Sequence, residues 1–140
     1  MQEWALWAIA SAVFAALTAI FAKVGIEGID SNFATFIRTL VIVAALILFL
    51  TYAKKWQSLE TLSAKNWLFL ILSGLATGAS WLAYFKALQI GKASQVAPID
   101  KFSLVLVVVF AVIFLGERPN IKEWLGIGLI ASGVFVLVFK

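Results

Sequence analysis

The stretch WALWAIASAVFAALTAIFA, residues 4–22, decides the class of fold because it holds 19 consecutive residues without a charge. A helix rises about 1.5 Å per residue, so a run of roughly 17–25 apolar residues crosses the hydrocarbon of a bilayer. Working outward from this run, four more segments of similar character follow along the chain. The predicted spans are residues 4–22, 33–53, 67–85, 96–116 and 124–139. We therefore expect an all-α integral membrane protein with five transmembrane helices.

The composition supports lipid as the surrounding solvent. Hydrophobic residues make up 64% of the 140 residues, against about 45–50% in typical globular chains. Cysteine and histidine are both absent, which excludes disulfides, thiol chemistry, most zinc sites and imidazole catalysis. No glycine-rich phosphate loop or Ser–His–Asp set is present either. We expect no enzymatic activity, no metal and no cofactor.

The basic residues lie in ones and twos between apolar segments, so their pattern favours membrane flanks rather than a nucleic-acid partner. Five spans place the two ends of the chain on opposite sides of the membrane. The basic residues on the side of the N-terminus are Lys54, Lys55, Lys65, Arg118 and Lys122. The basic residues on the other side are Lys23, Arg38, Lys86, Lys92, Lys101 and Lys140. The difference is one residue.

Orientation in a membrane follows the difference in basic residues between the two sides, and here that difference is nearly nil. One interpretation is a fixed orientation set by this weak bias or by the insertion machinery. The other is dual topology, in which copies insert both ways and pair as an antiparallel dimer that imitates inverted repeats.

Charged residues inside the spans are the first candidates for function, because each costs several kcal/mol in the bilayer. They are Arg38 in the second span and the pair Asp100–Lys101 in the fourth. Both spans start on the same side, so these charges are expected at similar depth. Arg38 could pair with Asp100 and leave Lys101 for an anionic group, a carbonyl or the interface. The alternative is a structural ion pair near the headgroups.

Pro98 precedes this pair. A proline there either leaves the Ser94 carbonyl without its helical partner or begins the helix at its first turn. A span that carries proline and charges together is more suited to a cavity wall than to lipid. If transport is coupled to protons, Asp100 is the first candidate for the coupling residue and Glu117 the second.

The third span offers a small-residue face with aromatic neighbours. Gly74 and Gly78 form a GxxxG step, and Trp81 and Tyr84 provide flat walls with a polar edge. The fifth span has a further small-residue face formed by Gly126, Gly128, Ser132 and Gly133. We expect the glycines and Ser132 to be helix-packing positions, and Trp81 and Tyr84 to line a substrate cavity.

Three motifs resemble the EamA domain of the drug/metabolite transporter superfamily. The strongest is the tail APIDKFSLVLVVVFAVIFLGERPNIKEWLGIGLIASGVFVLVF, residues 97–139. The others are SGLATGASWLAYFKALQIGKASQVAP, residues 73–98, and FIRT, residues 36–39. Together the resemblance covers nearly the whole chain as a single domain over residues 1–140.

The resemblance implies a five-helix unit that usually occurs as two inverted copies in a metabolite transporter. Arg38, Pro98 and Glu117 match positions that the family commonly marks, while Asp100 and Lys101 look like a feature of some single-domain members. The chain also resembles the small multidrug resistance proteins in size, but it lacks their deep glutamate.

We expect a transporter of small metabolites or organic compounds that works by alternating access as an antiparallel homodimer in a prokaryotic cell (inner) membrane. The alternative is a non-transporting accessory or half-transporter subunit that needs a sister chain.

Overall fold

A computed structural model describes residues 3–138 and contains only helices and loops over that range. Five segments in it are long and apolar enough to span a membrane, which confirms the predicted fold class. The spans are Glu3–Gly25, Ser31–Tyr52, Ala64–Ile90, Ala93–Leu115 and Ile121–Val138. Residue 139, where the fifth span was predicted to end, and Lys140 lie outside the described residues. The third helix, Ala64–Ile90, exceeds its predicted span of residues 67–85 because polar flanks such as Lys65 and Lys86 continue the helical backbone beyond the apolar run.

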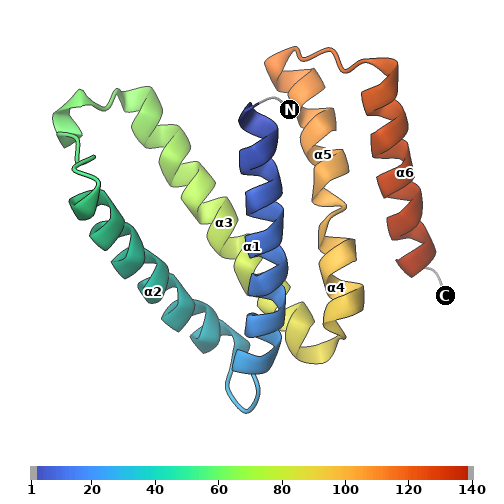
Figure 1. The fold of residues 1–140 in the computed structure, drawn as a ribbon, viewed down its shortest axis with the longest axis horizontal. Helices are drawn as coiled ribbons and strands as arrows, with labels where there is room; N and C mark the ends of the chain where they lie inside the picture. The colour runs from blue at the N-terminus through green and yellow to red at the C-terminus, as the bar shows by residue number, and fades with distance from the viewer. Residues whose placement is uncertain (1–2, 139–140) are drawn as a thin grey trace. The chain divides into compact units, whose positions relative to one another are not determined.

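Close contacts gather within two parts of the chain, which we call the first unit (up to Ile90) and the second unit (from Gly91). The first unit holds α1 (Glu3–Gly25), α2 (Ser31–Tyr52), the short 3₁₀ turn η1 (Leu59–Thr61) and α3 (Ala64–Ile90). Within it, α3 packs against both α2 and α1. Figure 1 shows α2 and α3 close together near the α1–α2 turn and diverging toward η1.

The core of the first unit lies at the end where these helices converge. Leu88 and Phe85 of α3 are 0% and 2% exposed, and Ile26 of the α1–α2 turn is 3% exposed. Ala19 of α1 and Ala34 of α2 are also buried, and their small side chains let the helices approach. Away from this end, the large apolar side chains face outward along every span. Such a surface is stable only in contact with lipid or with another membrane helix.

The α1–α2 turn sets where the second span begins. Gly28 adopts φ +76°, a left-handed conformation that glycine accepts without steric cost. Two residues later the carboxylate of Asp30 accepts hydrogen bonds from the backbone N–H groups of Asn32 (2.9 Å) and Phe33 (3.1 Å). This is an N-cap, and it fixes the start of α2 at Ser31.

The second unit holds α4 (Ala93–Asp100), α5 (Ser103–Phe110), the π-helical turn η2 (Ala111–Leu115) and α6 (Ile121–Val138). Here α6 packs beside both α4 and α5, and the rings of Phe102 and Phe135 meet edge to face at 6.0 Å. A reciprocal cap starts α6, because Asn120 Oδ1 accepts from the Glu123 N–H (3.0 Å) and Glu123 Oε2 accepts from the Asn120 N–H (2.6 Å).

The fourth span is two helices rather than one. Its helix begins at Ala93, so the interpretation that Pro98 starts the helix is wrong, and Pro98 lies inside α4. The helix then stops at Asp100, and the N–H groups of Lys101 and Phe102 turn back to the carbonyls of Pro98 (3.1 Å) and Ile99 (2.9 Å). An interior proline removes the hydrogen bond to the carbonyl four residues back and crowds the preceding turn, so it weakens this short helix on the N-terminal side of the break.

Candidate functional site

Arg38 lies seven residues after the start of α2, which places it about 10 Å along the helix at 1.5 Å per residue. Its position follows from the Asp30 cap, because the cap sets the rotational phase of every later residue of the helix. The residue is half-buried inside an otherwise apolar segment. Its charge therefore needs a stabilising neighbour.

Aromatic rings from α3 supply that neighbour. The guanidinium carbon of Arg38 lies 4.4 Å from the centroid of the Trp81 ring and 5.1 Å from that of Phe85. Trp81 and Phe85 are four residues apart and so lie on one face of the helix. The tyrosine between them, Tyr84, meets the Phe85 ring edge to face at 6.4 Å. The structure thus brings two side chains of α3, Trp81 and Phe85, to Arg38, the one arginine among residues 3–90.

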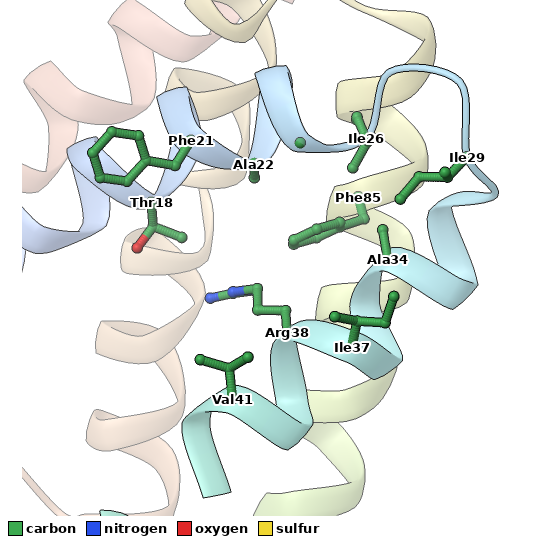
Figure 2. Close-up of a pocket in the computed structure, with 11 residues that line it drawn as sticks. Thr18, Phe21, Ala22, Ile26, Ile29, Ala34, Ile37, Arg38, Val41 and Phe85 are labelled. Carbon is green, nitrogen blue, oxygen red and sulfur yellow. The ribbon is translucent and has the colours of Figure 1, made fainter. Parts of the chain in front are cut away.

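A pocket of about 430 Å³ lies beside Arg38. Figure 2 shows the Arg38 side chain reaching into it from α2, with Phe85 of α3 and Thr18 of α1 on other sides. Eleven residues line it, namely Thr18, Phe21, Ala22, Gly25, Ile26, Ile29, Ala34, Ile37, Arg38, Val41 and Phe85. Its size falls within the range of small-molecule pockets, roughly 300–1,000 Å³. Apart from Arg38 and Thr18 its side chains are apolar.

The threonine hydroxyls of the first unit differ in their hydrogen bonding. The Oγ1 atoms of Thr35, Thr39 and Thr77 each donate to the carbonyl four residues back at 2.8 Å. Among residues 3–90, the Thr18 hydroxyl makes no such bond. Thr18 therefore keeps a donor and an acceptor at the wall of the pocket.

The end of the first unit near the pocket is held by two side-chain contacts between distant segments. Lys23 Nζ, at the end of α1, donates to the Leu88 carbonyl in the last turn of α3. Gln89 Nε2 donates to the Ile29 carbonyl at 2.9 Å. The last carbonyls of a helix lack partners within it, so both contacts stabilise the position of α3 against the α1–α2 turn.

Asp100 and Lys101 lie at the break in the fourth span. Lys101 Nζ is 3.5 Å from Asp100 Oδ2, and the two side chains are 51% and 35% exposed, respectively. The predicted pairing of Arg38 with Asp100 joins the two units and stays a prediction, as does the role of this pair as a gate. A discontinuous helix with charges at its break is nevertheless an arrangement that membrane transporters use around their substrates.

Sequence reasoning assigned the cavity walls to Trp81 and Tyr84, but the residues lining this pocket include neither of them. Phe85 lines it instead, and Trp81 acts through its contact with Arg38. The signal for Phe85 was its four-residue spacing from Trp81 on a helix. Phe21 and Ile26 could not be found from the sequence, because one apolar residue in a span resembles any other.

The glycines predicted to be helix-packing positions have open space around them. A Cβ atom added to Gly74, Gly78, Gly126, Gly128 or Gly133 would meet nothing within 4 Å among the described residues. Ser132 Oγ donates to the Gly128 carbonyl at 2.8 Å and is exposed. Their packing role therefore stays a prediction, and a helix of another molecule would have to supply the partner.

Glu117 lies just after Gly116, whose φ of +68° ends the π-helical turn. With Arg118 and Glu123 it lines a second hollow of about 550 Å³ in the second unit. Glu117 is thus in a loop and exposed, rather than within a helix.

Comparisons with known proteins agree with this architecture. Residues 2–139 match the EamA-like transporter family. An uncharacterized transporter in the cobO 3′ region of Sinorhizobium sp. is 54% identical over 97% of this chain and 96% of its own length. The uncharacterized transporter YxxF of Bacillus subtilis (strain 168) is 28% identical over the whole chain, a match that covers 44% of the Bacillus protein. An uncharacterized protein of Methanocaldococcus jannaschii is 28% identical over 90% of this chain.

No solved structure matches the chain. The family match covers all five spans, and the Sinorhizobium relative aligns with this chain over nearly its full length. The chain is a multi-pass membrane protein that belongs to the EamA-like transporter family.

Proposed function

We propose that the protein moves a small molecule across the membrane by alternating access, and that the pocket beside Arg38 forms part of the substrate site. The observation that carries the proposal is the half-buried guanidinium of Arg38, held on the rings of Trp81 and Phe85 inside an apolar span. A charge at the centre of a spanning helix costs about 2.5–3.5 kcal/mol on insertion scales, and Arg38 lies about 10 Å along α2 toward that centre. A cation–π contact offsets only about 0.5–2 kcal/mol of it. A ligand-binding role explains why the charge is retained.

The proposal also assigns a role to the break in the fourth span. Pro98 lies inside α4, and the carboxylate of Asp100 and the ammonium of Lys101 lie where that helix ends. Two short helices joined at residues 101–102 can change their mutual angle more easily than one continuous helix. We assign Asp100 and Lys101 to a gate that opens to one side of the membrane at a time, with Asp100 as the first candidate for proton coupling and Glu117 as the second.

Two five-helix domains form the transport path in this proposal. The match to the Bacillus transporter covers 44% of that protein, which leaves it room for a second domain of this kind. The near-equal numbers of basic residues on the two sides of the membrane support insertion in both directions. The partner domain is therefore another copy of this chain, inserted antiparallel in a prokaryotic inner membrane. A sister chain of opposite charge bias is the alternative partner.

The experiment is transport by the purified protein in proteoliposomes. The vesicles are loaded with a radiolabelled extract of cell metabolites, and the compounds released are separated and counted. We expect the wild type to release a subset of compounds that protein-free vesicles and vesicles with Arg38→Gln retain. Equal release from the wild type and from protein-free vesicles would contradict transport by this chain alone. Release that requires a co-reconstituted sister chain would favour the half-transporter alternative.

Orientation is tested separately with a reporter fused to the C-terminus. Dual topology predicts signal from both sides of the membrane in one population of cells. Adding three lysines to the loop between residues 54 and 66 should shift the population to one side and lower transport, because antiparallel pairs would become rare. Signal from one side only in the unmodified protein would exclude dual topology and leave the transport proposal standing.

A further inference from the structure

The charges around the Arg38 pocket specify the class of molecule that it takes, an inference that rests on the proposed function. The acidic residues of the described first unit are Glu3, Glu27, Asp30 and Glu60. Within that unit, residues 3–90, no carboxylate forms an ion pair with Arg38. Asp30, the acidic residue nearest to it in sequence, accepts from two backbone N–H groups at the start of α2. The positive charge of Arg38 is thus not neutralised by its own unit.

The hydrogen-bonding groups of the guanidinium are available to a ligand. The ring centroids of Trp81 and Phe85 lie 4.4 and 5.1 Å from its carbon, and a cation–π contact uses none of the N–H donors as a hydrogen bond to an acceptor oxygen. The five N–H donors of an arginine point outward in the plane, not toward the faces. Among residues 3–90, none of these donors has a hydrogen-bond partner. A planar fork of this kind matches a carboxylate bidentately.

Apart from Arg38 and Thr18, the side chains that line the pocket are apolar. Phe21 and Ile26 belong to α1 and the turn after it, and Val41 follows Arg38 by three residues on the same face of α2. These side chains would cover a hydrocarbon or aromatic body but offer it no hydrogen bond. The Thr18 hydroxyl is the one other polar side chain at the wall of the pocket. The pocket is therefore polar and cationic at one place and apolar elsewhere.

We propose that the Arg38 pocket binds small organic anions with one acidic group and an apolar body. The acidic group accepts hydrogen bonds from the edge of the Arg38 guanidinium, with Thr18 in reach of a second oxygen. The apolar body lies against Phe21, Ile26 and Val41. Trp81 holds the guanidinium in place through its ring and, because it does not line the pocket, does not itself contact the ligand. Cations are rejected because they would meet an uncompensated positive charge in a poorly hydrated site.

Two matched sets of probes test the class of ligand. One is benzoate, benzamide and benzylammonium, and the other is hexanoate, hexanamide and hexylammonium. Within a set the body is constant and only the charge changes. Binding to the purified protein in detergent is followed by tryptophan fluorescence, which reports on the site because Trp81 touches Arg38. The midpoint of thermal unfolding gives a second, independent signal.

We expect the carboxylates to bind at least about tenfold more tightly than the matched amides and ammonium ions, as a charge-assisted bidentate contact predicts. Arg38→Gln should lose this preference, and Arg38→Lys should keep part of it, because lysine retains the charge but not the fork. The matched control is Arg118→Gln, which removes the other arginine of the chain and should leave carboxylate binding unchanged.

The outcomes separate this inference from the proposed function. A lack of response to both carboxylates, or an equal response in Arg38→Gln, overturns the anion inference even if the labelled-extract assay shows transport. Preferred binding of the ammonium ions or the amides overturns it as well. If carboxylates bind in an Arg38-dependent way but nothing is transported, the anion site stands and the transport proposal fails. The comparison within each probe set uses the wild type alone, so it is informative even if Arg38→Gln does not fold.

Discussion

The guanidinium of Arg38 rests on the ring of Trp81 at 4.4 Å, so that a cation of α2 is stabilised by an aromatic face of α3. This contact links the two helices of the first unit that pack most closely. The same arginine side chain reaches into the pocket (Figure 2). The position of this one charge is therefore a tertiary feature as well as a local one.

Replacing Trp81 tests how much the contact between its ring and the Arg38 guanidinium contributes to stability and transport. Trp81→Ala should lower the stability of the first unit by about 1–2 kcal/mol beyond the loss of apolar area, because a partly desolvated cation–π contact is lost. Transport of the labelled extract should fall with it, since Arg38 is then less well positioned. Trp81→Phe keeps a ring face and is the matched control. Wild-type transport by Trp81→Ala would show that the ring does not position the arginine.

We expect the Asp30 N-cap of α2 to affect the stability of the protein more than its transport activity. Asp30→Ala removes the acceptor for the N–H groups of Asn32 and Phe33 and should cost about 0.5–2 kcal/mol, measured as a lower midpoint of thermal unfolding. Asp30→Asn should be close to the wild type, because asparagine caps a helix about as well. An unchanged midpoint for Asp30→Ala would mean that the surrounding structure holds the start of α2 without the cap.

Substitutions in the Asp100–Lys101 pair distinguish a structural role of the pair from a functional one. Its partners are 35% and 51% exposed, and an ion pair of that exposure contributes at most about 1 kcal/mol. Asp100→Asn and Lys101→Ala should therefore leave the unfolding midpoint and dimer formation nearly unchanged. If the pair forms a gate, both variants should abolish transport in proteoliposomes. Unchanged transport in both would return the pair to a structural role.

Pro98 gives a prediction in which stability and activity move in opposite directions. Pro98→Ala restores an N–H group that can reach the Ser94 carbonyl, and proline inside a helix costs about 3 kcal/mol relative to alanine. The variant should be more resistant to thermal unfolding and should show slower hydrogen exchange within α4, around residues 94–98. Transport should decrease, because α4 without its proline bends less. Full transport by the more stable variant would show that the proline is not needed.

The open space at Gly74 and Gly78 predicts where a second copy packs. A Cβ atom at either position would meet nothing within 4 Å among the described residues, so we expect a larger side chain there to leave the fold of one copy intact. If the α3 face packs against another copy, Gly74→Leu and Gly78→Leu should reduce cross-linked dimer in membranes. Ala76→Leu, which lies on the opposite face of α3, is the control. Equal dimer yields for all three variants would place the dimer contact elsewhere.

Much of the architecture could be predicted from single segments of sequence. The bilayer requires a fixed length of apolar chain, and within each span the backbone must form its own hydrogen bonds, so runs such as residues 4–22 have few alternatives to a helix. The same reasoning singled out Arg38, Asp100 and Lys101, because a charge in lipid is expensive wherever it occurs. Helix ends were less predictable, since a polar residue such as Lys65 stays helical beyond the apolar run.

The sequence by itself thus determined the number of spans, their order and the rare charges within them, because these depend on the transfer of local segments into lipid. Only the tertiary structure decided that Arg38 lies on Trp81 and Phe85 and that Phe21 and Ile26 share its pocket. Those relationships depend on how α1, α2 and α3 converge. Convergence is set by small residues such as Ala19 and Ala34 together with the Gly28 turn, and similar residues occur throughout the spans without marking a contact. Their physical effect arises only when three helices meet.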